Sequence, residues 1–148
     1  ISRDEFEQRV SDGGFLEYVE YCGNLYGTPM KEVNEMLEKG MNVILEIEVQ
    51  GAIKVMNKRP DALSIFIAPP SIAELRRRLH KRGTETEDVI EQRIAQASNE
   101  VALAAKYDYI IVNDVLEDAV DDFFHVVRAE QLRSDKRPEI IADIIKNS

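Results

Sequence analysis

The stretch Ile44-Leu45-Glu46-Ile47-Glu48-Val49-Gln50-Gly51-Ala52 sets two carboxylates in an otherwise apolar run. Residues 42–48 predict a strand buried on both faces of a parallel sheet, and Gln50-Gly51 predicts a turn into a helix. Residues two apart on a strand share a face, so Glu46 and Glu48 are expected side by side, where burial is costly unless something binds them. The alternative is that they lie at the exposed carboxyl end of the strand, where open parallel sheets bind ligands.

The second half of the chain alternates strand and helix patterns, which predicts an α/β fold with parallel strands and helical crossovers. Capping-box patterns begin at Ser71 and Thr84, and a turn at Gly83 would fold the two helices into a hairpin. The expected strands are 63–68 and 107–112, and the expected helices begin near 71, 84, 116 and 138.

The front of the chain predicts a local antiparallel patch. Residues 15–27 alternate, are rich in aromatic side chains and have a turn at Gly23-Asn24, which is typical of a hairpin. Thr28-Pro29 have the residue types of an N-cap and a first helical position. The side chains expected to point inward from that helix are Val33, Met36 and Leu37.

The size and net charge of the chain limit the classes of function that it can have. The chain has 148 residues, enough for one domain with a core, and a net charge of −9, which disfavours general nucleic-acid binding. No apolar run is long enough to span a bilayer, so we expect no membrane partner. The single cysteine, Cys22, cannot form an internal disulfide, which favours a cytoplasmic location, and we expect it to be a small apolar filler on a strand.

Basic residues crowd one short segment of this acidic chain, which suggests a compact anionic ligand such as a phosphate group. They are Arg76, Arg77, Arg78, His80, Lys81 and Arg82. Arg78 and Arg82 share a helix face, and the turn at Gly83 could bring Arg93 of the next helix to them. The alternative is a solvated row that offsets the helix macrodipole. A convergent cluster would suit phosphoryl transfer, where fixed cations stabilise charge spread over oxygens.

The carboxylates and a nearby hydroxyl suit one nucleobase. A carboxylate can accept two parallel hydrogen bonds, and guanine presents such donors at its ring N–H and exocyclic amine. Thr28 could donate to the guanine carbonyl, whereas adenine would leave buried groups unpaired. Glu17 lies on another predicted strand, where the alternative is a solvated position. Tyr26 could stack or donate to a phosphate, and the alternative is a half-buried strand aromatic.

Taken together, these residues resemble the guanylate kinase family, the ATP:GMP phosphotransferases, nearly from end to end. The matching segments are Asp4-Glu5-Phe6, Phe15-Leu16-Glu17-Tyr18, Gly23-Asn24, Tyr26-Gly27-Thr28-Pro29, Leu45 to Ala52, Ile65-Phe66-Ile67, Pro69-Pro70-Ser71, Arg82-Gly83-Thr84-Glu85 and Val112-Asn113-Asp114. The resemblance implies a P-loop NTPase-like fold, with a three-layer parallel-sheet core, a small GMP-binding subdomain and a helical lid. The boundaries it implies within one partial guanylate-kinase-like domain are 1–40 (mainly GMP-binding), 41–70 (core), 71–105 (lid) and 106–148 (core).

The resemblance also implies roles for individual residues. Glu17, Thr28 and Glu48 would contact guanine, and Tyr26 the GMP phosphate. The lid arginines Arg78, Arg82 and Arg93 would close over the ATP phosphates and the transferred group. Asn113 matches a position near adenine, and Glu46 an acidic position near Mg²⁺, acting through water.

Two departures from the family pattern stand out. Position 48 is glutamate where the family more often has aspartate, so the longer side chain needs more room. The family's first strand and P-loop are expected to be absent, since no Gly-x-x-x-x-Gly-Lys-Ser/Thr pattern occurs in the chain. The alternative function is a guanylate-kinase-like scaffold module that binds phosphorylated peptides without catalysis, although such a module has no need of the arginine and carboxylate set.

A polypeptide of these 148 residues alone is predicted to show no measurable kinase turnover. The reason is that a P-loop backbone and its lysine cradle the ATP phosphates and help to hold Mg²⁺. The measurement is GMP-dependent release of ADP, and ordinary enzyme rates from this polypeptide would contradict the prediction.

Overall fold

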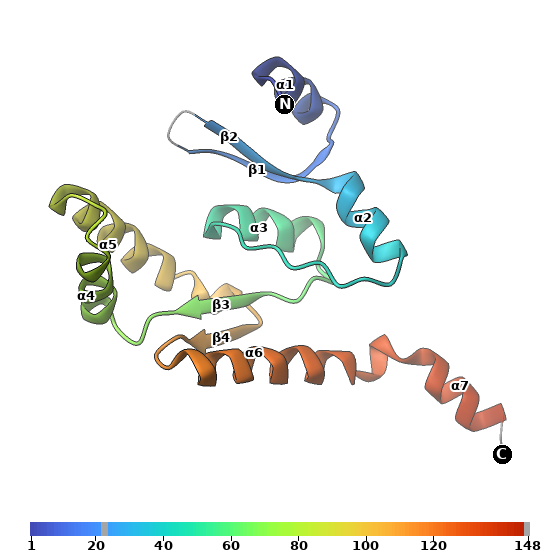
Figure 1. Cartoon of the computed structure of the whole chain (residues 1–148). Coiled ribbons are helices and arrows are strands. Elements are labelled where there is room, and N and C mark those ends of the chain that lie inside the picture. Colours follow the sequence, from blue (N-terminus) through green and yellow to red (C-terminus); the bar gives the residue numbers. More distant parts are fainter. Residues whose placement is uncertain (22–23, 147–148) are drawn as a thin grey trace. The chain divides into compact units, whose positions relative to one another are not determined.

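The structure, a computed structural model, describes residues 1–21 and 24–146 (Figure 1). The chain divides into two compact units, Ile1–Ala62 and Leu63–Ser148, and each is described by itself. Within the described ranges, no helix has both the length and the apolar character needed to cross a membrane. Residues Cys22 and Gly23, on which the expected filler and part of the expected turn fall, lie outside the described residues.

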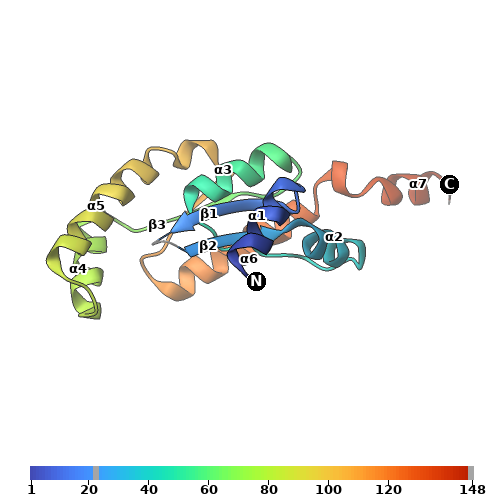
Figure 2. The ribbon, with the colours of Figure 1, turned by 90° about the horizontal axis from the view of Figure 1, so that it is seen from above.

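The first unit is built around an antiparallel hairpin. Its elements are α1 (Arg3–Ser11), β1 (Phe15–Tyr21), β2 (Asn24–Pro29), α2 (Met30–Glu38) and α3 (Val49–Lys58). Strands β1 and β2 pair as the alternation predicts, and α3 lies alongside β1 in both views (Figures 1 and 2). Phe6 of α1 stacks on Phe15 of β1 with ring centroids 4.4 Å apart, which attaches α1 to the hairpin.

A bulge and a glycine shape the hairpin. Phe15 pairs with Pro29 and Glu17 with Thr28, so the register shifts by one residue along β1 between them. The Phe15 ring then crosses Gly27 of β2, where an added Cβ would lie 2.9 Å from Phe15 Cδ1. The absence of a side chain at position 27 is therefore what lets the aromatic ring lie across the partner strand.

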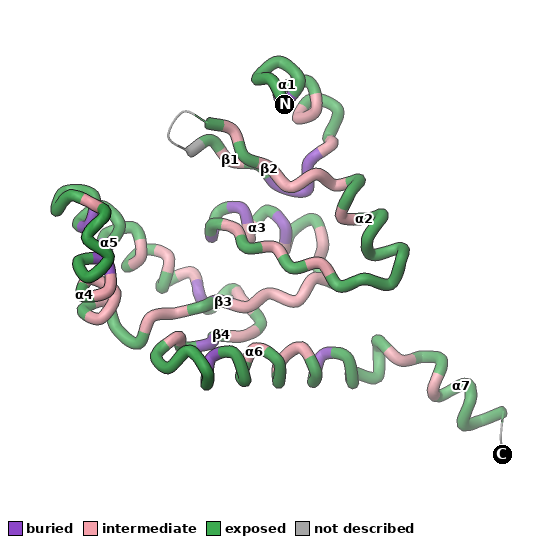
Figure 3. The backbone as a smooth tube through the Cα atoms, viewed as in Figure 1, coloured by how far each residue is buried: buried purple, intermediate pink, exposed green. Residues whose placement is uncertain are grey.

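The predicted N-cap at Thr28 is wrong. Thr28 lies inside β2, and Pro29 occupies the N-cap position of α2 without a side-chain hydrogen bond. Pairing with β1 keeps Thr28 extended, and its hydroxyl donates to Glu17. The expected inward positions of α2 are also wrong at Met36 and Leu37, which are 41% and 37% exposed. Figure 3 shows α2 as largely exposed, because little of the described unit covers its apolar face.

The predicted buried strand at 42–48 is wrong as well. The structure forms no strand between α2 and α3, and Ile44 is 75% exposed. A strand exists only through a ladder with a neighbour. Within the described part of the first unit, β1 and β2 pair with each other and leave this segment without a partner. The predicted helix after Gln50-Gly51 is confirmed as α3, which begins at Val49.

The second unit confirms the predicted parallel α/β arrangement. Its elements are β3 (Ile65–Ala68), α4 (Ile72–Arg82), α5 (Glu87–Val101), η1 (Ala104–Lys106), β4 (Tyr109–Val112), α6 (Leu116–Gln131), η2 (Ser134–Lys136) and α7 (Pro138–Lys146). Strands β3 and β4 are parallel and in register from Ile65 opposite Tyr109 to Ala68 opposite Val112. Helices α4 and α5 form the crossover between them.

Polar side chains fix the amino ends of the parallel strands. The Asp108 carboxylate accepts hydrogen bonds from the hydroxyl and backbone N–H of Ser64, which lower the pKa of Asp108. Tyr109 donates its hydroxyl to the buried Glu130 at 3.0 Å, and Lys136 pairs with the same carboxylate. Burial would raise the pKa of Glu130, but the hydrogen bonds from Lys136 and Tyr109, together with the charges of Arg133 and Lys136, lower it. The start of β4 is thus tied to the end of α6.

The helical hairpin of α4 and α5 turns at Gly83 as predicted, and the predicted cap at Ser71 is confirmed. The capping box predicted at Thr84 is wrong, because the N-cap residue of α5 is Thr86 and its side chain makes no capping hydrogen bond. The Ser71 hydroxyl accepts from the Glu74 N–H, and Gly83 ends α4 with a φ of 63°, a conformation that favours glycine. Leu79 packs with Ile90 and Ile94 to form the core of the hairpin, and Ile72 and Leu75 flank it.

Replacing Leu79 with alanine is expected to destabilise the second unit by about 2–4 kcal/mol, because it leaves a cavity beside Ile90 and Ile94. The measurement is urea unfolding followed by far-UV circular dichroism. Val89→Ala on α5 is the control, since Val89 is 38% exposed and should change little. Equal effects of the two substitutions would contradict a core role for Leu79.

Candidate functional site

Glu17 is the most constrained of the candidate site residues. It is 5% exposed, and its Oε1 accepts a hydrogen bond of 2.7 Å from the Thr28 hydroxyl. The two residues are direct partners across the hairpin, so their side chains lie on one face. Oε2 faces Gly51 of α3 and accepts no hydrogen bond from any residue that the structure describes. A buried carboxylate therefore keeps one oxygen free for a ligand donor.

Tyr26 lies on the same face of β2 as Thr28, two residues away. It is 54% exposed, so its ring and hydroxyl are accessible to a ligand. Tyr26 also borders a groove beside α1 that Arg3 and Arg9 line. Sequence reasoning missed these two arginines. Arg3 lies four residues before Glu7, the spacing of an ordinary ion pair on a solvated helix face, and the Arg9–Glu32 pair joins two separate helices.

Glu46 and Glu48 are both exposed, but not at the carboxyl end of a strand as the alternative had it. Both lie in the segment that forms no strand, and Glu48 is the N-cap residue of α3 without a side-chain capping bond. Glu48 therefore lies one helical turn before Gly51, the residue that contacts Glu17. No hydrogen bond joins either glutamate to Glu17 or Thr28 among the described contacts.

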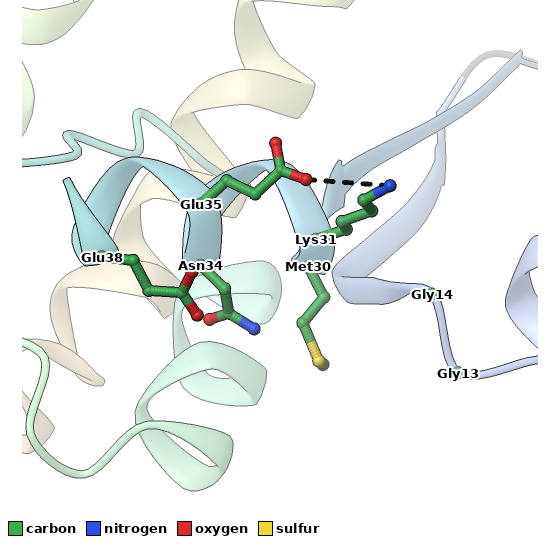
Figure 4. Close-up of a pocket in the computed structure, with 7 residues that line it drawn as sticks. All are labelled: Gly13, Gly14, Met30, Lys31, Asn34, Glu35 and Glu38. Atoms are coloured by element: carbon green, nitrogen blue, oxygen red, sulfur yellow. Dashed lines mark ion pairs between the residues drawn. The ribbon is translucent and has the colours of Figure 1, made fainter.

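A second groove in the first unit contains none of the predicted site residues. Figure 4 shows it between the glycine turn after α1 and one side of α2, with Lys31 and Glu35 forming an ion pair of 3.7 Å. Its lining residues are Gly13, Gly14, Met30, Lys31, Asn34, Glu35 and Glu38. This groove offers no buried polar partner of the kind found at Glu17.

Arg78 is anchored inside the second unit. Its Nη1 donates to the Asn113 carbonyl at 2.6 Å, and its Nη2 donates to the Asp114 carbonyl at 3.2 Å. Its Nε donates to Glu74 at 2.7 Å, and Arg77 binds the same carboxylate. Hydrogen bonds from Arg77 and Arg78 lower the pKa of Glu74 to about 2. Arg78 thus joins α4 to the loop that follows β4.

The other two lid arginines have different surroundings. Arg93 pairs with Glu85 at 3.0 Å, and the second carboxylate oxygen of Glu85 is buried without a hydrogen-bond partner among the described residues. Arg82 is exposed at the end of α4, and no described carboxylate lies within ion-pair distance of it. No shared partner therefore gathers Arg78, Arg82 and Arg93 into the convergent cluster that the sequence could form.

Asn113 follows directly after β4, at the carboxyl edge of the parallel pair. Its N–H donates to the Ala68 carbonyl at 2.8 Å, which extends the ladder by one bond, and its carbonyl accepts from Arg78. This edge is where open parallel sheets bind ligands. Over residues 1–21 and 24–146 no group of three or more histidine, cysteine, aspartate or glutamate side chains could hold a metal ion.

Proteins similar to this chain in sequence or in structure are named guanylate kinases. The sequence family described as guanylate kinase matches residues 1–130. The guanylate kinase of Streptococcus thermophilus is 52% identical over 135 residues, which cover 91% of this chain and 65% of that protein. The guanylate kinase of Thermus thermophilus is 48% identical over 141 residues, which cover 95% of this chain and 64% of that protein. The crystal structure of guanylate kinase from Anaplasma phagocytophilum has a TM-score of 0.72 and 37% identity, and the match covers 90% of this chain and 65% of that one.

The parallel strand pair with its helical crossover, together with this structural neighbour, defines an α/β protein of the P-loop NTPase-like class. Within that class, the chain belongs to the guanylate kinase family. It spans about 65% of the length of the curated relatives that it matches.

Replacing Glu74 with glutamine is expected to lower the stability of the second unit at neutral pH and to flatten its pH dependence in acid. The pKa of Glu74 falls from an ordinary 4.5 to about 2 on folding, so its contribution is complete above pH 4.5 and is lost as the pH falls towards 2. Urea unfolding between pH 7 and pH 2 measures the effect, with the exposed Glu38→Gln as the charge-matched control. The same acid dependence in the variant and in the wild type would show that Glu74 is not its source.

Proposed function

We propose that the intact protein transfers the γ-phosphoryl group of ATP to GMP, giving GDP and ADP in purine nucleotide metabolism. The observation that carries this proposal is the buried Glu17 carboxylate, bound at one oxygen by Thr28 and free at the other. Membership of the guanylate kinase family supports this proposal, and the relatives from Streptococcus thermophilus and Thermus thermophilus are themselves named guanylate kinases. The same names argue against a non-catalytic scaffold module.

The Glu17 and Thr28 pair suits guanine and disfavours adenine. Guanine would donate its ring N–H and exocyclic amine to carboxylate oxygens, and Glu17 presents such an oxygen inside the protein. Adenine has an acceptor in place of that ring N–H, so it would leave the buried carboxylate without a donor. Glu48, one turn before Gly51, is the second guanine contact in this proposal, and the accessible Tyr26 binds the GMP phosphate.

The lid arginines would act on the phosphates. In the transfer, an ionised oxygen of the GMP phosphate attacks the γ-phosphorus while the bond to the β–γ bridging oxygen breaks, and ADP leaves. That oxygen already carries charge, so no dedicated base is required, and catalysis comes from positioning and charge neutralisation. We assign the neutralisation to Arg78, Arg82 and Arg93, of which Arg82 is exposed and without an ion pair among the described residues.

The proposal includes Mg²⁺ bound with ATP. Magnesium sites of kinases commonly use one or two carboxylates together with substrate phosphates and water, and one exposed carboxylate, Glu46, fits such a contact made through water. Asn113, at the carboxyl edge of the strand pair, is the residue assigned to the adenine side. The single cysteine supports a cytoplasmic location, and the GMP-binding, lid and core boundaries given above belong to the same proposal.

Replacing Glu17 with glutamine in the intact protein is expected to weaken GMP binding by about 10–100-fold, because one acceptor of a charged hydrogen bond is replaced by an amide. Isothermal titration with GMP and with AMP measures the effect, and the wild type should bind GMP far more tightly than AMP. Glu20→Gln, an exposed substitution on the same strand, is the control. Binding of a phosphorylated peptide without binding of GMP would overturn the proposed function in favour of a scaffold role.

A further inference from the structure

Gly51 lies in the first turn of α3 at a position where the backbone does not require glycine. The described glycines with a positive φ are Gly13, Gly40 and Gly83, and Gly51 has ordinary helical geometry. Glycine inside a helix destabilises it relative to alanine. Because Gly51 is also buried, its small size calls for an explanation from its neighbours.

The neighbour is the Glu17 carboxylate. A Cβ added to Gly51 would lie 2.9 Å from Glu17 Oε2 and 3.4 Å from Glu17 Cδ, so an alanine would force the carboxylate to move. Glu17 Oε1 is held at 2.7 Å by Thr28 on the other side. Any shift away from position 51 therefore strains the Thr28 bond or turns Oε2 away from its present direction.

Helix α3 is not free to retreat from the hairpin. Lys54 donates to the Tyr18 carbonyl at 2.9 Å, and Lys58 donates to the Phe15 carbonyl at 3.1 Å. With Gly51 these lysines lie at i, i+3 and i+7, on one face of the helix. The two carbonyls flank Glu17 along β1, so the separation between the strand and the helix is fixed on both sides of the carboxylate.

We propose that Gly51 is the specificity-determining residue of this site and acts as a positioning residue through Glu17. By leaving no side chain at this point, Gly51 keeps the carboxylate in the orientation that directs Oε2 to the guanine donors. This inference rests on the proposed function, since it assigns Glu17 to guanine. A larger residue at position 51 would fold into the same helix and spoil the recognition of the base.

The test is Gly51→Ala in the intact protein. The KM for GMP is expected to rise about tenfold or more, because the substitution removes a well-placed charged hydrogen bond to the base. The KM for ATP should be unchanged. Gln50→Ala is the matched control, because Gln50 is exposed on the same turn of α3 and should leave both values unchanged. Unchanged GMP affinity in Gly51→Ala, or equal increases in the two KM values, would overturn the proposal.

A double-mutant cycle with Glu17→Ala separates this inference from the proposed function. Removing the Glu17 side chain makes room at position 51, so Gly51→Ala should then have no further effect on GMP affinity and should cost no stability. If Glu17→Ala itself leaves GMP affinity intact, Glu17 does not bind guanine, and both this part of the proposed function and the role of Gly51 fail. If Glu17→Ala weakens GMP but Gly51→Ala does not, only the role of Gly51 fails. A folding defect of Gly51→Ala that persists without the Glu17 side chain would also refute the role of Gly51.

Discussion

The burial of the Glu17 carboxylate is the constraint on which the first unit depends. An ionised group that is 5% exposed must be paired, and one pairing in the described residues is the Thr28 hydroxyl at 2.7 Å. That bond requires Thr28 to stay in β2 opposite Glu17, so α2 cannot begin before Met30. It also requires space on the helix side, which Gly51 provides. The strand register, the helix start and a helical glycine thus follow from one buried charge.

In the second unit, Arg78 makes the contacts that hold separate elements together. This guanidinium joins the Glu74 carboxylate on its own helix to the carbonyls of Asn113 and Asp114 after β4. One side chain therefore links the helical hairpin to the carboxyl edge of the parallel strands. An arginine suits this position because its planar fork donates in several directions at once and stays charged at any physiological pH.

Local chemistry made much of the fold predictable. The cap at Ser71, the left-handed glycine at position 83 and the parallel strands act within a few residues or follow from periodicity, and these three features are present as expected. The expectations that failed depended on distant partners. Residues 42–48 have the composition of a buried strand but no ladder neighbour in their unit, and Thr28 has the chemistry of a cap but bonds to a residue eleven positions away. Composition shows which secondary structure a segment can form, and contacts with distant residues decide whether it forms.

By itself, the sequence determined the family, the α/β class and the residue types of the candidate site, because motif order and periodicity are written along the chain. Only the tertiary structure decided which partners those residues have. It placed Glu17 between Thr28 and Gly51, paired Arg93 with Glu85 and tied Arg78 to the end of β4. The physical reason is that hydrogen bonds and close packing act over a few ångströms in space, between residues whose separation along the chain carries no record of their contact.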